Sequence, residues 1–237
     1  MQAKSGDLEL YKQIENLNRR TYAAMVHSLD ENVGKIIQTL DRLDLRENTL
    51  VVFLSDNGGP CDQNYSLNSP LRGQKGILLE GGVRVPFIFS WPGSVPAGKI
   101  YEQPVTSLDI APTFEYLASH KTSSNYSGVN LMPFIENRDQ SGPHKTLKWK
   151  FTISRAILDN GYKLVSIPDR LPMLYHLPTD ISEKQNLALD SVELTKQLMK
   201  KLGQWDVSLP HPLFLEGAQW KEKQLNLYDK QYNLHTD

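Results

Sequence analysis

VVFLSDNGGPC, residues 51–61, is the stretch that decides the fold. Its apolar start is short and rich in branched residues, which is typical of a strand covered on both faces, as in a parallel sheet. Directly after Leu54 come Ser55, Asp56 and Asn57, and then two glycines. Because ligands of open α/β sheets gather beyond the carboxyl ends of the strands, we expect these polar residues at a binding edge.

The chemistry of Asp56 and Asn57 supports two interpretations. A carboxylate and a carboxamide oxygen are hard donors that suit calcium or magnesium, and Gly58 and Gly59 would let the backbone turn sharply and approach a ligand. The alternative is an Asx-turn, in which the two side chains bond to their own backbone. The stretch by itself leaves both interpretations open.

The composition of the chain excludes several classes of protein. The chain has 237 residues, 39% hydrophobic and 22% charged, with a net charge of -1. This balance gives no strong field toward nucleic acid or an anionic membrane, and no window reaches the roughly 18 apolar residues of a membrane span. The polar N-terminus lacks the core of a signal peptide. The single cysteine, Cys61, excludes an intrachain disulfide and a thiolate metal cluster.

The first part of the chain alternates between helix and strand patterns. Residues 19–43 carry an apolar stripe at helical spacing, and RVPFIFSW at 84–91 predicts a second strand. The segment LDIAPTFEYLA predicts a further helix, capped by Thr106 or Ser107. We therefore expect an α/β fold. The helical stripe consists of Tyr22, Met25, Val26, Leu29, Val33, Ile36, Ile37, Leu40 and Leu43.

The second part of the chain has a different character. Alternating segments flank the hairpin signal DNG at 159–161, PMLYHL supplies another strand, and residues 190–205 form an amphipathic helix pattern. The tail after Trp205 shows no clear period. We therefore divide the chain into an α/β part, 1–144, and a small antiparallel sheet with a helix and tail, 145–237. The expected buried side of the late helix is Val192, Leu194, Leu198, Met199 and Leu202.

A basic, glycine-rich loop follows the candidate metal residues. It contains Arg72, Lys75, Glu80 and Arg84 and leads into the second strand. Cations beside a metal site suit an anion, because lysine offers a compact charge and arginine a fork of donors. The pair of sites suggests metal-assisted chemistry on a phosphate or sulfate ester. The alternative is a solvated basic loop in which Arg84 pairs with Glu80.

Three segments together carry a resemblance to a known family. SDNGG followed by LRGQKGILLEGGVRVPFIFSWPG resembles the second half of the sulfatases, in the alkaline phosphatase superfamily. YAAMVHSLDENVGKIIQTL is similar to the helix that precedes that strand, and MLYHLPTDISEKQNLA is similar to the C-terminal segment of these enzymes. The resemblance covers about residues 20–205. It implies part of an alkaline-phosphatase-like mixed sheet sandwiched by helices, followed by the small antiparallel sheet.

The resemblance also implies roles for matching residues. Asp56 and Asn57 fall on metal ligands, usually for Ca²⁺ with Mg²⁺ as the alternative, and Lys75 falls on the lysine that contacts the sulfate group of the substrate. The family nucleophile is a formylglycine made from a Cys/Ser-x-Pro-x-Arg motif in the first half, which no segment upstream of Asp56 matches. We therefore expect a fragment that is inactive alone and needs the missing N-terminal half as its partner. We expect the parent to hydrolyse a sulfate ester of a carbohydrate, in a periplasmic or secreted location.

Two alternatives to a sulfatase stay open at this point. One is a phosphoesterase or phosphonate hydrolase of the same superfamily, and the other is a non-catalytic module that binds sulfated glycans. SIPDR, Ser166 to Arg170, fits the nucleophile motif by its letters, but it is predicted to connect two strands, whereas the family nucleophile begins a helix. No histidine is assigned to the site; those considered are His120, His144, His176, His211 and His235.

Overall fold

The computed structural model describes residues 1–211, 213 and 217–231, so His235 and the end of the predicted 145–237 part lie outside the described residues. None of the described helices combines the length and apolar content that a membrane crossing requires. The chain divides into two compact units: Met1–Ile36, Leu54–Phe87 and Thr146–Asp237 form the first, and Ile37–Phe53 with Ile88–Lys145 forms the second. The division into 1–144 and 145–237 stays a prediction.

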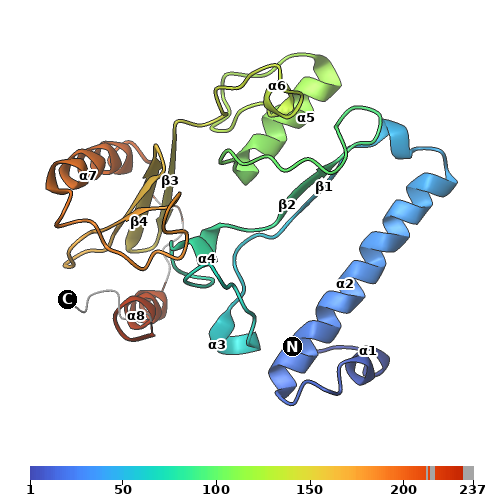
Figure 1. Ribbon diagram of the computed structural model, residues 1–237, viewed down its shortest axis with the longest axis horizontal. Helices are drawn as coiled ribbons and strands as arrows, with labels where there is room; N and C mark the ends of the chain where they lie inside the picture. The colour runs from blue at the N-terminus through green and yellow to red at the C-terminus, as the bar shows by residue number, and fades with distance from the viewer. Residues whose placement is uncertain (212, 214–216, 232–237) are drawn as a thin grey trace. The chain divides into compact units, whose positions relative to one another are not determined.

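The elements are shown in Figure 1. In chain order they are α1 (Ser5–Leu10), α2 (Leu17–Arg42), η1 (Arg46–Asn48), β1 (Val51–Leu54), α3 (Cys61–Asn64), α4 (Glu80–Val83), β2 (Phe87–Ser90), η2 (Ser107–Asp109), α5 (Ile110–Ser119), α6 (Met132–Ile135), β3 (Thr146–Phe151), β4 (Ser154–Asp159), β5 (Tyr162–Ser166), β6 (Met173–His176), α7 (Val192–Asp206), α8 (Ala218–Asn226) and η3 (Leu227–Gln231).

The predicted C-terminal sheet and its hairpin are confirmed. Four antiparallel strands follow the order β3-β4-β5-β6. Asp159 pairs with Tyr162, so the turn contains only Asn160 and Gly161, whose φ angles are 49° and 80°. Two successive positive φ angles are what a type I′ hairpin requires, and Asn-Gly adopts them at low cost. The DNG signal therefore sets the register of the sheet.

One face of this sheet packs against α7 (Figure 1). The cross-strand row Ile157, Leu164 and Leu174 meets Leu198 and Leu202 of the helix. Fully burying a side chain of this size contributes about 1.5–3 kcal/mol. The predicted helix is thus confirmed.

The predicted buried side of α7 needs one correction. Val192 is 44% exposed, because it lies at the first position of the helix, before the apolar stripe reaches the sheet.

The other face of the sheet packs against segments that are distant in the chain. The row Ala156, Val165 and Met173 belongs to one buried cluster with the 77–79 segment and with Tyr228. The sheet therefore connects the glycine-rich loop to the end of the chain. This is the packing that positions the candidate site.

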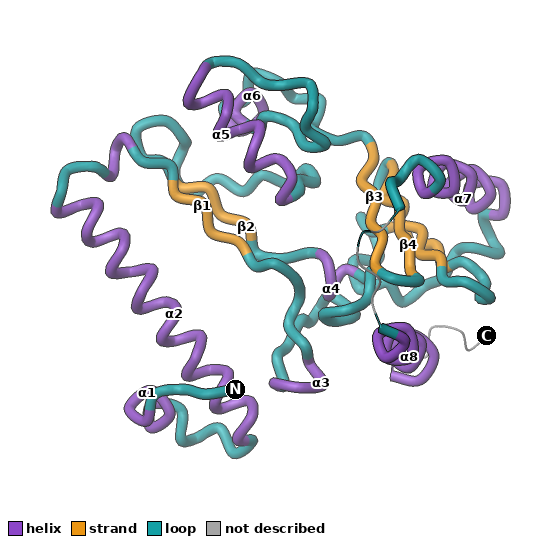
Figure 2. The backbone as a smooth tube through the Cα atoms, turned by 180° about the vertical axis from the view of Figure 1, so that it is seen from behind, coloured by secondary structure: helices purple, strands orange, loops and turns teal. Residues whose placement is uncertain are grey.

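Strands β1 and β2 form where they were predicted, but the predicted parallel arrangement is wrong for this pair. The two strands are neighbours in a two-stranded sheet, as Figure 2 shows. Beyond β1, Ser55 N–H donates to Pro86 O at 3.2 Å and Gly58 N–H donates to Gly82 O at 3.0 Å. Since one residue number rises while the other falls, the segments run antiparallel.

The long helix α2 is confirmed, and much of its apolar stripe is exposed. Met25 is 39% exposed, Leu29 52% and Ile36 59%, while Ala24 is fully buried. Helical spacing reports that one face is apolar and does not report what covers it. Exposed apolar faces of this kind favour association.

In the second unit, the predicted start of the helix LDIAPTFEYLA is confirmed. Thr106 and Asp109 form a capping box, with Thr106 N–H donating to the Asp109 carboxylate at 2.8 Å. The same carboxylate is fully buried, accepts from Val129 N–H at 2.8 Å and lies 2.9 Å from His144 Nε2. His144 therefore serves the packing of this unit.

Candidate active site

The turn after β1 leaves the two predicted metal ligands available. Asp56 is exposed and Asn57 is partly buried. The local bond that forms is from Ser55 Oγ to Asn57 O, at 2.8 Å, and it uses neither candidate side chain. Within the described part of the chain, the side chains of Asp56 and Asn57 make no hydrogen bond, so no Asx-turn is present there. Both side-chain oxygens can therefore accept a ligand.

The glycines after this turn have a different role from the predicted one. Gly58 does not adopt a positive φ. A Cβ atom on Gly58 would lie 1.7 Å from the backbone oxygen of Gly81, and one on Gly82 would lie 2.1 Å from Ile77 O. These glycines allow two backbones to touch, because any side chain would clash. Gly58 brings the turn of Asp56 against α4, and Gly82 allows α4 to pack against the backbone of Ile77.

The side chain of Asn68 joins the same turn to the Lys75 loop. Its Nδ2 donates to Gly59 O at 2.9 Å and to Gly73 O at 3.0 Å, and its Oδ1 accepts from Gly59 N–H at 3.2 Å. Together with the Gly58–Gly82 bond, this contact links the segments 56–59 and 72–82 on both sides of α3. The structure thus brings together the two loops that the sequence marked separately.

Lys75 lies at the surface of a loop whose backbone is otherwise packed. The side chain of Lys75 is exposed, while its neighbour Gln74 is fully buried. Gly73 and Gly76 have φ angles of 100° and 95°, in the region that only glycine adopts readily. The two glycines therefore flank Lys75, and their backbone conformations determine the point at which its side chain leaves the loop.

A buried cluster of charges lies behind this loop, and the sequence analysis missed it. Lys163 Nζ, fully buried, is 2.7 Å from Glu80 Oε1 and 3.2 Å from Glu183 Oε1. Glu183 Oε2 also accepts from Glu80 N–H at 2.6 Å. The only available signal was a lysine on the same strand face as Val165.

The cluster has one more carboxylate than the lysine can neutralise. Burial is the main cause that raises the pKa of Glu183 to about 7, with Lys163 acting in the opposite direction. The exposed side chain of Arg84 lies 3.6 Å from Glu80, which is the pairing expected if the loop is a solvated basic loop. The cluster therefore stabilises the loop from within and does not face a ligand.

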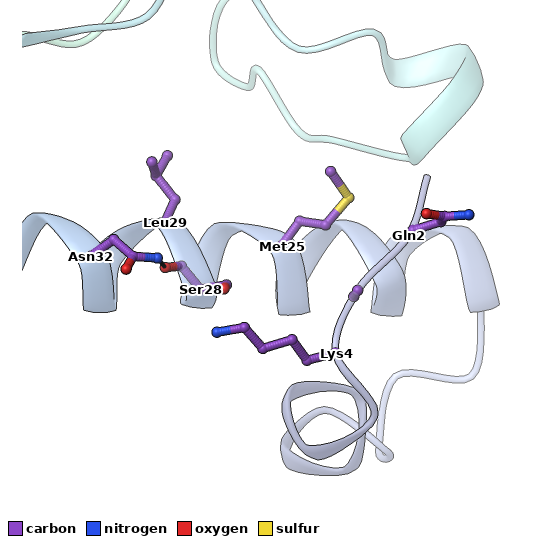
Figure 3. A pocket seen from close by; sticks show the side chains of 7 residues that line it. Gln2, Lys4, Met25, Ser28, Leu29 and Asn32 are labelled. Atoms are coloured by element: carbon purple, nitrogen blue, oxygen red, sulfur yellow. Dashed lines mark hydrogen bonds between the residues drawn. The ribbon is translucent and has the colours of Figure 1, made fainter.

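Other candidate groups do not form a competing site. Asp7, His27 and Glu31 lie close enough to share a cation, but Lys4 Nζ already lies 4.0 Å from Asp7 and 3.8 Å from Glu31. Figure 3 shows the adjoining open hollow, where Met25 and Leu29 project from α2. It contains none of the predicted site residues. We therefore assign this region to ion pairing at the surface.

The SIPDR segment lies between strands, as predicted. Ser166 is the last residue of β5 and is 5% exposed, and Arg170 pairs with Asp229 at 3.0 Å. The segment does not begin a helix, so it lacks the setting of an anion-binding nucleophile.

Comparisons with known proteins give matches over most of the chain. The chain matches the sulfatase family over residues 4–120 and the C-terminal part of N-sulphoglucosamine sulphohydrolase over residues 74–208. Human arylsulfatase H is 40% identical over 135 residues, covering 53% of this chain and 24% of that protein. A sulfatase of Formosa agariphila is 32% identical over 237 residues, covering 84% of this chain and 42% of that protein.

Solved structures extend the likeness over nearly the whole chain. The crystal structure of Ps i-CgsB is 32% identical with a TM-score of 0.83, covering 98% of this chain and 53% of that one. The same protein has been solved in complex with k-i-k-neocarrahexaose, at 33% identity. The chain thus spans from about a quarter to about half of the length of these relatives. The predicted α/β fold class, with a small antiparallel sheet and helix, is confirmed.

Proposed function

Because the chain belongs to the sulfatase family, we propose that it supplies the second half of an enzyme that hydrolyses sulfate esters. The observation that carries this proposal is the junction of two loops. The free oxygens of Asp56 and Asn57 lie on a turn that Gly58 holds against α4, and the loop before α4 presents Lys75 at the surface. The two residues that could bind a metal ion and the positively charged Lys75 thus lie on loops that contact each other.

Asp56 and Asn57 fit a share of a calcium shell, with magnesium as the alternative. Their oxygens are hard donors, and neither side chain makes a hydrogen bond to the described residues. Calcium takes about six to eight oxygens, so two residues provide only part of the shell. When bound, such a metal would polarise the oxygens of the sulfate group. We propose that the remaining ligands and a formylglycine come from a segment equivalent to the first half of the relatives.

Lys75 would bind the sulfate group directly. Its ammonium is a compact charge with three donors, which can offset the negative charge that grows on the ester and sulfate oxygens as the S–O bond breaks. Because the side chain is exposed, it can reach a ligand without displacing a partner. The buried Lys163 cannot take this role.

A sulfated carbohydrate is the substrate class that we propose. Two findings support it: the match to a sulphohydrolase of N-sulphoglucosamine, and the likeness to a protein solved with a carrahexaose. Polymeric substrates of this class do not cross membranes, so we also propose a periplasmic or secreted location for the enzyme. Fractionation of the native cells, followed by detection of this chain, tests the location.

The test of the function uses the longest natural polypeptide that contains this chain, produced with the formylglycine-generating enzyme. We expect release of sulfate from sulfated oligosaccharides, a loss of about 10²- to 10³-fold in kcat/KM for Lys75→Ala, and no change for the exposed control Lys200→Ala. Preference for a phosphonate or phosphate diester would instead support a related hydrolase. Sulfate binding that depends on Lys75, without turnover, would support a non-catalytic module.

A further inference from the structure

We propose that Gln224 and Tyr228 are positioning residues that hold the Lys75 loop in place, an inference that rests on the role proposed for Lys75. They lie on the C-terminal segment formed by α8 and η3, in which the sequence analysis found no period. The structure shows that the period exists. Trp220, Gln224, Leu227 and Tyr228 follow helical spacing, and a glutamine at the centre of the face hides it.

Gln224 holds Gly76, the residue that follows Lys75, by a hydrogen bond. Its side chain is fully buried, and Nε2 donates to Gly76 O at 2.9 Å. Phe151 O at 3.2 Å and Ser154 Oγ at 3.1 Å also lie within hydrogen-bond distance of this nitrogen, so its two hydrogens are shared among three acceptors. One amide therefore ties the loop to the hairpin of β3 and β4. A buried amide with several partners is costly to disturb, so its position is well defined.

Tyr228 fastens the loop two residues further on. Its hydroxyl accepts from Leu78 N–H at 2.8 Å, and both residues are buried in the same apolar cluster. Trp220 and Leu227 lie near Gly76, where a Cβ atom would be 3.6 Å and 3.9 Å from them. The face of this segment thus covers the loop as well as bonding to it.

A second set of contacts holds the two ends of the loop. Arg72 Nη1 donates to Glu183 O at 2.9 Å, and Glu80 N–H donates to the carboxylate of Glu183 at 2.6 Å. The loop is therefore anchored through its backbone at residues 76, 78 and 80 and through the side chain of Arg72, on both sides of Lys75. An exposed lysine on a fixed backbone is pre-organised, since only its side chain must be ordered when an anion binds.

Hydrogen exchange of the 237-residue chain tests the anchoring without any assay of activity. Tyr228→Phe removes the acceptor of the Leu78 amide, and we expect that amide to exchange about tenfold faster or more. The amides of Leu164 and Leu174, in the sheet, should change by less than about twofold.

The matched control is Tyr175→Phe, which makes the same chemical change in the same apolar cluster. Within the described residues, the Tyr175 hydroxyl bonds to no loop amide, so Leu78 exchange should stay the same. Equal acceleration of all amides by Tyr228→Phe would assign Tyr228 a purely structural role and overturn the proposal. An unchanged Leu78 amide would overturn it as well.

Gln224→Met, with the exposed Gln219→Met as control, repeats the test at Gly76. We expect faster exchange confined to the 76–79 amides and the adjoining β3–β4 turn. Exchange that is unchanged in the loop would overturn the role of Gln224.

In the complete enzyme, Tyr228→Phe should lower kcat/KM about tenfold when Lys75 is present and have no further effect when Lys75 is alanine. An equal loss in both backgrounds would overturn positioning through Lys75. If the complete polypeptide has no sulfatase activity, the proposed function fails, whereas the exchange result still decides whether the loop is anchored.

Discussion

Two lysines in this molecule have opposite surroundings, although both belong to the structure around one loop. Lys75 is exposed between two glycines of positive φ, whereas Lys163 is fully buried between two carboxylates. The ammonium of Lys75 is accessible to solvent, whereas the ammonium of Lys163 pairs with Glu80 and Glu183 inside the fold. The comparison shows that the loop that presents Lys75 is supported from behind by buried polar contacts.

The largest effect on stability is expected from replacing the buried lysine, Lys163. Lys163→Met leaves Glu183 without its buried cation and Glu80 with only the exposed Arg84, which should lower the free energy of unfolding by about 3–5 kcal/mol. Lys75→Ala should change it by less than about 0.5 kcal/mol, as should Lys200→Ala. Urea unfolding of the three variants measures this. Similar losses for Lys75 and Lys163 would show that the two lysines do not differ in role.

The close backbone contact between Gly58 and Gly81 provides a second test of how the loop around Lys75 is held. Gly58→Ala places a methyl group 1.7 Å from Gly81 O, so the turn or α4 must move, at a cost of about 1–3 kcal/mol. The control is Gly34→Ala in α2, where nothing lies within 4 Å and alanine favours the helix by about 0.5–1 kcal/mol. Thermal unfolding should therefore shift in opposite directions. A shift in the same direction would contradict the close contact.

The buried cluster should also make stability depend on pH. The pKa of Glu183 is raised from 4.5 to about 7 by burial, so the folded state holds more protons than the unfolded state between these values. The contribution of Glu183 is therefore full below the lower value and falls as the pH rises toward the upper one. Glu183→Gln mimics the protonated form and should flatten this slope. An unchanged slope in urea midpoints measured across that range would exclude Glu183 as its source.

The smallest effect concerns the metal. Two oxygen ligands complete only part of a calcium shell, so calorimetry of this chain should detect weak calcium binding or none, and the chain alone should not hydrolyse an aryl sulfate. Asp56→Asn should therefore change calcium affinity little in the isolated chain, but should weaken it strongly in the complete enzyme. Submicromolar affinity in the isolated chain would show that its own residues complete the shell.

Much of the local structure was predictable because it depends on neighbours in sequence. The DNG turn, the helices over α2, α5 and α7, and the polar end of β1 all follow from spacing and turn chemistry. The exposed lysine and its two flanking glycines also lie within four residues of one another. The direction of the β1–β2 pair depends on distant segments, and there the parallel arrangement predicted from the sequence was wrong. What covers the α2 stripe also depends on distant segments, and the sequence did not predict it.

The sequence by itself determined which family the chain resembles and which side chains offer oxygen or positive charge. Only the tertiary structure decided what holds them. Glu80 meets Lys163 across 83 residues, and Leu78 meets Tyr228 across 150. No period or motif encodes such contacts, because they arise where one face of the sheet buries two distant parts of the chain. From the sequence, a lysine or glutamine is predicted to lie at the surface, and only its partners in the fold show that it is buried.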